Sequence, residues 1–380
     1  MDALHRSIAR GPGLPGGPNE ERSRGITGLV YRSVRSASRL VGGSLDAILA
    51  SLVPMLGPRE SSREREAVLA ALNGVLGDHL AKTGNPLAIR ACFRHSGRPL
   101  VLERSALELL FPGAGGRLAV FVHGLCMNDL GWNREGHNHA AALARDLGTQ
   151  PIHLRYNSGL HVSVNGRAFA GLLETLVESW PRPVEELVLV GHSMGGLVSR
   201  SACHYGKAAG NLWPQALRAL VTLGTPHHGA PLERIGNWIG LAMQATPYAS
   251  HFARLGRIRS AGITDLRYGN LLDEDWNGRD RFARGDDTRH VVPMVEGVPL
   301  FAIAGMVATA AKEEGGAIDR LLGDGLVPLG SALGHHRNPD RDLGLPPSSQ
   351  WVAYGTSHLD LLRSPEVTER LRGWLAAVGG

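Results

Sequence analysis

Residues 185–196 read EELVLVGHSMGG, and this stretch decides how the chain can fold. The apolar run at 187–190 is typical of a strand that is buried on both faces. A tight turn with Ser193 at its tip follows, and the apolar spacing after the turn suits a helix. Gly191 and Gly195 would let the turn pack against its neighbours, because glycine has no Cβ. Strand, turn and helix are the context of a G-x-S-x-G nucleophile elbow. The sequence therefore predicts Ser193 as a nucleophile, although a chain with 50 glycines can also contain this pentapeptide by chance.

The pattern around this stretch alternates between strands and helices. Helical spacing is found at 137–147 and 163–180. Further apolar runs that suit strands lie at 118–122, 151–155, 217–223, 299–304 and 351–354. Such alternation predicts an α/β fold with a mostly parallel central sheet and helices on both faces. In these sheets the functional site lies at the carboxyl ends of the strands.

The sequence divides into three parts. Residues 1–24 are rich in Gly, Pro, Arg and Glu and predict a disordered tail. Residues 25–99 predict a helical extension, with a second helix at 61–85 and strand-like pieces around 87–94 and 99–102 that could be antiparallel edge strands. Residues 100–380 predict the α/β domain, and its insertion at about 230–298 is expected to form a cap.

The helix expected at 26–56 has two interpretations. Its arginines and apolar residues would suit peripheral contact with a membrane surface. A helix that packs on the α/β domain, or on a second subunit, has the same pattern. The second interpretation is favoured because ordinary surface helices show this spacing.

A serine nucleophile needs a base within hydrogen-bond reach. His358 follows the last predicted strand and precedes a C-terminal helix, so it is the predicted base. Asp324, in the segment 323–328, is the predicted acid that orients it. The other candidates are less well placed: His227 and His228 follow a different strand, His335 and His336 lie in a polar loop, and Asp265, Asp273 and Asp275 are expected to be solvated carboxylates of the cap.

The oxyanion of a tetrahedral intermediate needs backbone donors. The N–H groups of Met194 and Leu125 are the predicted pair, and Gly124 would let the backbone approach closely. His123 is expected to brace this loop or to contact substrate. Trp238, in the apolar part of the cap, would line an acyl pocket or belong to the core.

The composition limits the classes of partner and cofactor that the chain is expected to bind. A net charge of +5, with no aromatic-rich basic patch, gives no reason to expect a nucleic acid. Three cysteines match no zinc motif or disulfide framework, and neither a metal nor another cofactor is expected. The first residues lack the apolar core of a signal peptide, and no apolar run spans a bilayer, which predicts a cytoplasmic protein. The sequence does not indicate an oligomeric state.

Five segments resemble those of the α/β-hydrolase superfamily, in its lipase and esterase branch: 123–125, 191–196, 223–229, 324–328 and 358–362. The chain is similar there to bacterial triacylglycerol-lipase-like and GPI-inositol-deacylase-like esterases, over roughly residues 100–375. The resemblance implies an α/β-hydrolase fold, a triad of Ser193, Asp324 and His358, and hydrolysis of a small-molecule or lipid carboxylic ester through an acyl-enzyme. Secreted lipases of this type carry a signal peptide and some bind calcium, and the sequence indicates neither. An acyltransferase with the same triad, or a binding module without catalysis, are the alternatives.

Overall fold

A computed structural model describes residues 45–56, 62–231, 259–280, 287–309 and 323–379. The chain divides into two compact units, Met1–Met55 and Leu56–Gly380. The described part of the first unit lies in helix α3 (Leu45–Leu56), which contains Pro54. The predicted tail and most of the helix expected at 26–56 lie outside the described residues, so membrane contact there stays a prediction. Among the described helices, none has both the length and the apolar character needed to cross a bilayer.

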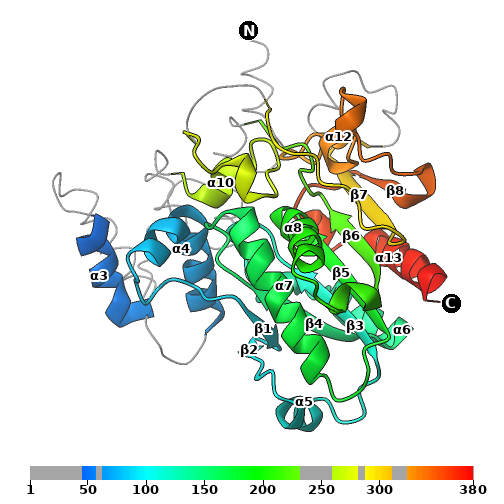
Figure 1. Cartoon of the computed structure of the whole chain (residues 1–380), viewed down its shortest axis with the longest axis horizontal. Coiled ribbons are helices and arrows are strands. Elements are labelled where there is room, and N and C mark those ends of the chain that lie inside the picture. Colours follow the sequence, from blue (N-terminus) through cyan, green and yellow to red (C-terminus); the bar gives the residue numbers. More distant parts are fainter. Residues whose placement is uncertain (1–44, 57–61, 232–258, 281–286, 310–322, 380) are drawn as a thin grey trace. The chain divides into compact units, whose positions relative to one another are not determined.

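The second unit is built on one eight-stranded sheet with the order β2-β1-β4-β3-β5-β6-β7-β8 (Figure 1). Strands β1 and β2 are antiparallel, β1 is antiparallel to β4, and all other pairs are parallel. The strands are β1 (Cys92–His95), β2 (Arg98–Pro99), β3 (Arg117–Val122), β4 (Gln150–Arg155), β5 (Glu186–His192), β6 (Leu217–Leu223), β7 (Leu300–Met306) and β8 (Gln350–Tyr354). The predicted α/β-hydrolase fold is confirmed.

The register aligns the carboxyl ends of the parallel strands along one rim of the sheet. Val122 is opposite Gly191 across β3 and β5, and His192 is opposite Leu223 across β5 and β6. Every residue from Leu187 to His192 is buried, which explains why this strand is apolar without alternation. The segments that follow these strand ends therefore meet at the same rim.

Helices cover both faces of the sheet (Figure 1). Helices α7 and α8 pack together on one face, whereas α6 and α13 join the apolar core on the other. Among the described residues, the helices of the second unit are α4 (Arg63–Lys82), α5 (Arg104–Leu110), α6 (His139–Leu147), α7 (Val162–Ser179), α8 (Met194–Ala208), α10 (Ala261–Asp265), α12 (Leu329–Ala332) and α13 (Pro365–Val378). Short 3₁₀ turns lie at Asp129–Trp132, Trp213–Ala216, Asp273–Asp275, Pro339–Arg341, Pro347–Ser349 and Asp360–Leu362.

Strands β1 and β2 are the antiparallel edge strands expected around 87–94 and 99–102. Helix α4 and strands β1 and β2 belong to the same compact unit as the rest of the sheet. A buried ion network joins them, because Arg94 of β1 lies 2.9 Å from Glu66 of α4 and 2.8 Å from Asp129. Breaking such a buried pair by removing one partner typically costs about 3–5 kcal/mol. This part of the predicted extension is therefore integral to the α/β domain.

The described part of the insertion lies beside α4. The Ser260 hydroxyl donates to the carbonyl oxygen of Gly74 at 2.6 Å, and the Ala261 N–H donates to Asp78 at 3.0 Å. Residues 232–258 and 281–286 of the insertion lie outside the described residues, and Trp238 is among them. The cap, as a cover over the site, stays a prediction.

Candidate functional site

Ser193 stands at the junction of β5 and α8 in a strained backbone conformation. Its φ is 57° and its ψ is −125°, a region that costs about 1–3 kcal/mol for a non-glycine residue. The Ser193 N–H donates to the carbonyl oxygen of Leu223 at 2.8 Å, and the Ser193 carbonyl accepts from Gly196 at 3.1 Å. These bonds hold the sharp turn that the sequence predicts.

The two glycines that flank Ser193 have the steric role expected of them. A Cβ at Gly191 would lie 2.5 Å from the nitrogen of Gly196 at the start of α8. A Cβ at Gly195 would lie 2.7 Å from the carbonyl oxygen of His123 and closer still to that of Val122. Helix α8 and strand β3 therefore approach the turn so closely that side chains at 191 and 195 are excluded.

His358 and Asp324 form a buried pair at the same rim. The Nδ1 atom of His358 lies 2.6 Å from Oδ2 of Asp324, and each residue is only 2% exposed. The other carboxylate oxygen, Oδ1, accepts the N–H groups of Leu326 and Val327 at 3.0 and 2.8 Å. The carboxylate can only accept, so Nδ1 carries the hydrogen. This tautomer leaves Nε2 as the nitrogen that can take up a proton.

Gly224, at the end of β6, makes room for this pair. Its φ is 58°, and a Cβ there would lie 3.0 Å from both Oδ2 of Asp324 and Nδ1 of His358. No role for Gly224 in this pair could be predicted from the sequence. A glycine directly after the strand at 217–223 is the feature of the sequence that could have indicated this role. Its contact with Asp324 and His358 could not be predicted, because these residues lie far along the chain.

A hydrogen bond between Ser193 and His358 is not formed in this structure. The Oγ atom of Ser193 is buried and has no hydrogen-bond partner among the described residues. Hydrogen bonds of this kind are often long or poorly aligned without substrate and tighten in the complex.

His192 precedes Ser193 in the chain and is hydrogen-bonded to His358. Its Nε2 donates to the carbonyl oxygen of His358 at 3.0 Å, and the two rings lie 4.7 Å apart. Complete burial lowers the pKa of His192 well below its usual value, so the ring is neutral. This hydrogen bond holds the backbone of His358 beside the turn that contains Ser193.

The loop after β3 lies directly against Ser193. A Cβ at Gly124 would lie 2.9 Å from Cβ of Ser193 and 3.3 Å from its Oγ. The Leu125 N–H donates to no acceptor among the described residues. Met194 is the first residue of α8, where a backbone N–H has no partner within the helix. Leu125 and Met194 follow Gly124 and Ser193 directly in the chain, and their role as the two oxyanion donors stays a prediction.

The His123 side chain is built into the fold. Its ring stacks on Tyr156 at 4.3 Å, its carbonyl oxygen accepts from the Tyr156 hydroxyl at 2.7 Å, and burial lowers its pKa to about 3. These contacts agree with a residue that braces the loop. Contact with substrate through His123, Gly124 or Trp238 stays a prediction.

The expectation of solvated carboxylates in the insertion is wrong for Asp265 and Asp275. Asp265 is 1% exposed and accepts from the Val162 N–H at 2.8 Å and from His161 at 3.0 Å. Asp275 is 5% exposed and accepts from the N–H groups of Leu271 and Leu272. Asp273 alone forms a surface ion pair, with Arg167. Asp265 and Asp275 hold the insertion together.

The other candidate histidines have other partners. His227 is buried beside Arg200 and Thr222, and burial lowers its pKa well below the usual value. His228 bonds to the carbonyl oxygen of Gly334, and burial lowers its pKa to about 4. No group of three or more His, Cys, Asp or Glu side chains in the described ranges is arranged to hold a metal ion.

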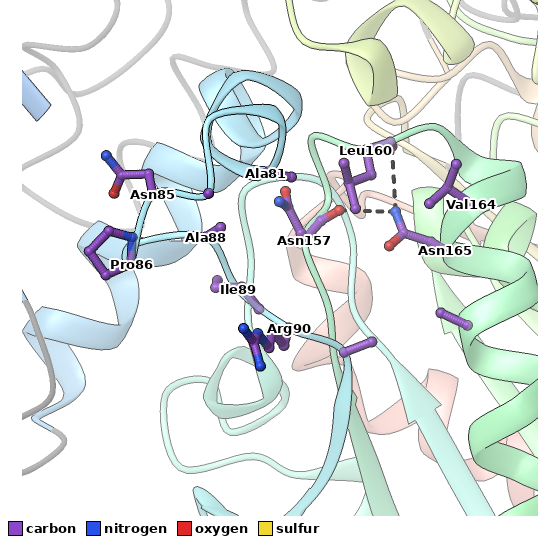
Figure 2. A pocket seen from close by; sticks show the side chains of 13 residues that line it. Ala81, Asn85, Pro86, Ala88, Ile89, Arg90, Asn157, Leu160, Val164 and Asn165 are labelled. Carbon is purple, nitrogen blue, oxygen red and sulfur yellow. Dashed lines mark hydrogen bonds between the residues drawn. The ribbon is translucent and has the colours of Figure 1, made fainter. Parts of the chain in front are cut away.

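A separate pocket of about 640 Å³ lies between the end of α4, the segment that leads into β1, and the start of α7 (Figure 2). Its walls are mostly apolar and include Ile89, Leu160 and Val164. Asn165 donates through Nδ2 to the carbonyl oxygens of Asn157 and Leu160 at 2.9 and 3.4 Å (Figure 2). Ser193, Asp324 and His358 are not among the residues that line it.

The chain is similar to several known proteins. The family model of the PGAP1-like alpha/beta domain matches residues 169–299, a segment that contains Ser193 and ends just before β7. No curated protein matches the chain.

Solved structures of lipases and esterases also match. The mature form of a lipase from Bacillus licheniformis is 18% identical with a TM-score of 0.44, and the match covers 76% of this chain and 98% of that one. An esterase from Pyrococcus furiosus is 13% identical with a TM-score of 0.40, covering 70% and 85%. An ester hydrolase from the metagenome of Lake Arreo is 15% identical with a TM-score of 0.41, covering 93% and 97%.

Proposed function

We propose that this chain, an α/β-hydrolase fold similar to lipases and esterases, is a serine hydrolase that cleaves carboxylic esters of hydrophobic acyl groups. The observation that carries the proposal is the buried pair of His358 and Asp324, joined at 2.6 Å, at the rim where Ser193 is held in a strained turn. A nucleophile, a base and an orienting acid are the parts that acyl transfer needs.

In the first half-reaction, Ser193 attacks the carbonyl carbon of the ester. Nε2 of His358 takes the Oγ proton as the bond forms, and Asp324 stabilises the resulting imidazolium through Nδ1–H without being protonated. The N–H groups of Leu125 and Met194 donate to the oxyanion. When the intermediate collapses, the bond to the alcohol oxygen breaks, His358 protonates that oxygen, and the acyl group remains on Ser193.

In the second half-reaction, water attacks the acyl-enzyme. His358 takes one proton from the water, and the same backbone donors stabilise the second oxyanion. Collapse releases the carboxylic acid and returns the proton to Ser193. The preference for hydrophobic acyl groups is proposed from the apolar residues of the insertion at about 230–298, including Trp238.

The nucleophile is tested by replacing Ser193. Ser193→Ala should lower kcat for a short-chain aryl ester by about 10⁶-fold, because triad losses commonly reach that size. A fluorophosphonate probe should label the wild type and leave Ser193→Ala unlabelled, since only an activated serine reacts. Ser199→Ala is the matched control, because the Ser199 hydroxyl donates within α8 to the carbonyl oxygen of Gly195 at 2.8 Å.

Near-normal turnover by Ser193→Ala would contradict the assignment. Product analysis with an added alcohol identifies the acceptor: release of the free acid supports hydrolysis, and transfer to the alcohol indicates an acyltransferase on the same residues.

A further inference from the structure

Helix α4 packs against the loop that follows β3 at a distance that only glycine permits. A Cβ at Gly74 would lie 2.9 Å from Cα of Cys126 and 3.0 Å from its nitrogen, and closer still to its Sγ. Cys126 is 5% exposed and has a φ of 58°. The helix backbone therefore touches the loop backbone at the residue after Leu125.

The same helix also packs closely against the loop that follows β4. A Cβ at Gly77 would lie 2.7 Å from Cγ of Asn157 and closer still to Oδ1. A Cβ at Gly159 would lie 2.7 Å from the nitrogen of Gly77. One turn of α4 thus contacts both rim loops, whereas Ala81 in its last turn lines the pocket of Figure 2.

A hydrogen bond joins the two loops. The Cys126 N–H donates to the Ser158 hydroxyl at 3.0 Å, and Ser158 is 1% exposed. Cys126 is therefore held from one side by α4 and from the other by Ser158. On the far side of the loop, Gly124 meets Ser193. Close-packed contacts of this kind transmit displacements because interiors have few voids.

We propose that Gly74 is a positioning residue for catalysis: by allowing α4 to touch Cys126, it fixes the Leu125 N–H where the oxyanion forms. The inference rests on the proposed function, in which Leu125 supplies one donor. It assigns a positioning role to helix α4, which lies outside residues 100–375, where the sequence resembles lipases and esterases.

Gly74→Ala tests the contact. The added methyl group should push Cys126 outward and displace the Leu125 N–H. Losing one oxyanion donor costs about 10²–10³-fold in rate, and a displaced donor should lower kcat by about 10–10²-fold with little change in KM. Gly171→Ala is the matched control, because Gly171 lies within α7 and no atom lies within 4 Å of a Cβ there. Its kcat should match the wild type.

A double-mutant cycle separates positioning from a general loss of stability. Cys126→Ala removes Sγ, the atom that an alanine at 74 would approach most closely. The loss of kcat caused by Gly74→Ala should therefore be at least about threefold smaller in the Cys126→Ala background, because residues in contact are not additive. If Gly74→Ala alone does not fold, kcat of the double variant is compared with kcat of Cys126→Ala. This comparison tests the remaining contact between the methyl group at position 74 and Cα of residue 126.

Amide hydrogen exchange tests the positioning without any ester. Exchange of peptides that cover residues 120–128 should be faster in Gly74→Ala than in the wild type and unchanged in Gly171→Ala. If kcat and exchange in Gly74→Ala both equal those of the wild type, or if kcat falls equally in both backgrounds, the inference is wrong. If the wild type cleaves no ester, the proposed function fails, and the exchange comparison alone decides whether Gly74 positions the loop.

Discussion

At the scale of single residues, the orientation of Asp324 is set by its own turn. One oxygen receives two backbone N–H groups, so the other is directed at Nδ1 of His358. Sequence position was enough to predict this pair, because both residues follow strands whose ends share a rim. It was not enough to predict His192 or Gly224, whose roles depend on neighbours distant in the chain.

Asp324→Asn should lower kcat by about 10⁴-fold, because an amide at this position favours the wrong tautomer of the histidine. The measurement is kcat for an aryl ester, with the folded state checked by circular dichroism. Asp273→Asn is the control, since the Asp273 carboxylate is partly exposed and pairs with Arg167 at the surface. A larger loss of kcat in Asp273→Asn or Asp275→Asn would indicate that the acid of the triad lies in the insertion.

At the scale of elements, strands and helices could be predicted because buried strands need apolar runs and helices need a repeating apolar face. The strand at 217–223 and the helix ending at Leu147 fall where the sequence predicts them. The pairing of β1 with β4 could not be predicted from spacing, since a long stretch of chain separates the two strands. Burial of Asp265 was missed for the same reason: its partners lie in another element.

Asp265 anchors the insertion to the start of α7, and burial raises the pKa of its carboxyl. Asp265→Ala would leave the buried Val162 N–H without its acceptor, which should lower the free energy of unfolding by about 1–3 kcal/mol. Asp273→Ala breaks a surface pair and should cost less than about 1 kcal/mol. Urea unfolding of both variants checks the difference, and equal costs would contradict the anchoring role.

At the scale of the whole molecule, the interior holds several neutral histidines. His139 is fully buried, bonds to the carbonyl oxygen of Leu361 at 2.8 Å, and has its pKa lowered to about 4 by burial. His123 has its pKa lowered to about 3. Below about pH 6.5 these histidines take up protons in the unfolded chain but stay neutral in the native protein. The free energy of unfolding therefore falls as the pH falls.

The free energy of unfolding should therefore be lower at pH 5 than at pH 7, by about 2 kcal/mol for His139 alone given its pKa near 4. His139→Gln should reduce this pH dependence, because it removes the buried imidazole whose pKa is lowered. Urea titrations at the two pH values measure the difference. An unchanged dependence in His139→Gln would show that the pKa of His139 is not lowered in the native protein.

The order of strands across the sheet also bears on synthesis of the protein. Ser193 follows the central strand β5, whereas His358 follows β8, the edge strand at the other end of the domain's sequence. Ribosomes add about 5–20 residues per second, so roughly 10–30 s separate the translation of these two residues. During that interval the nascent chain carries the proposed nucleophile without the proposed base. Under the proposed function, ester cleavage would therefore begin only after the last strand has joined the sheet.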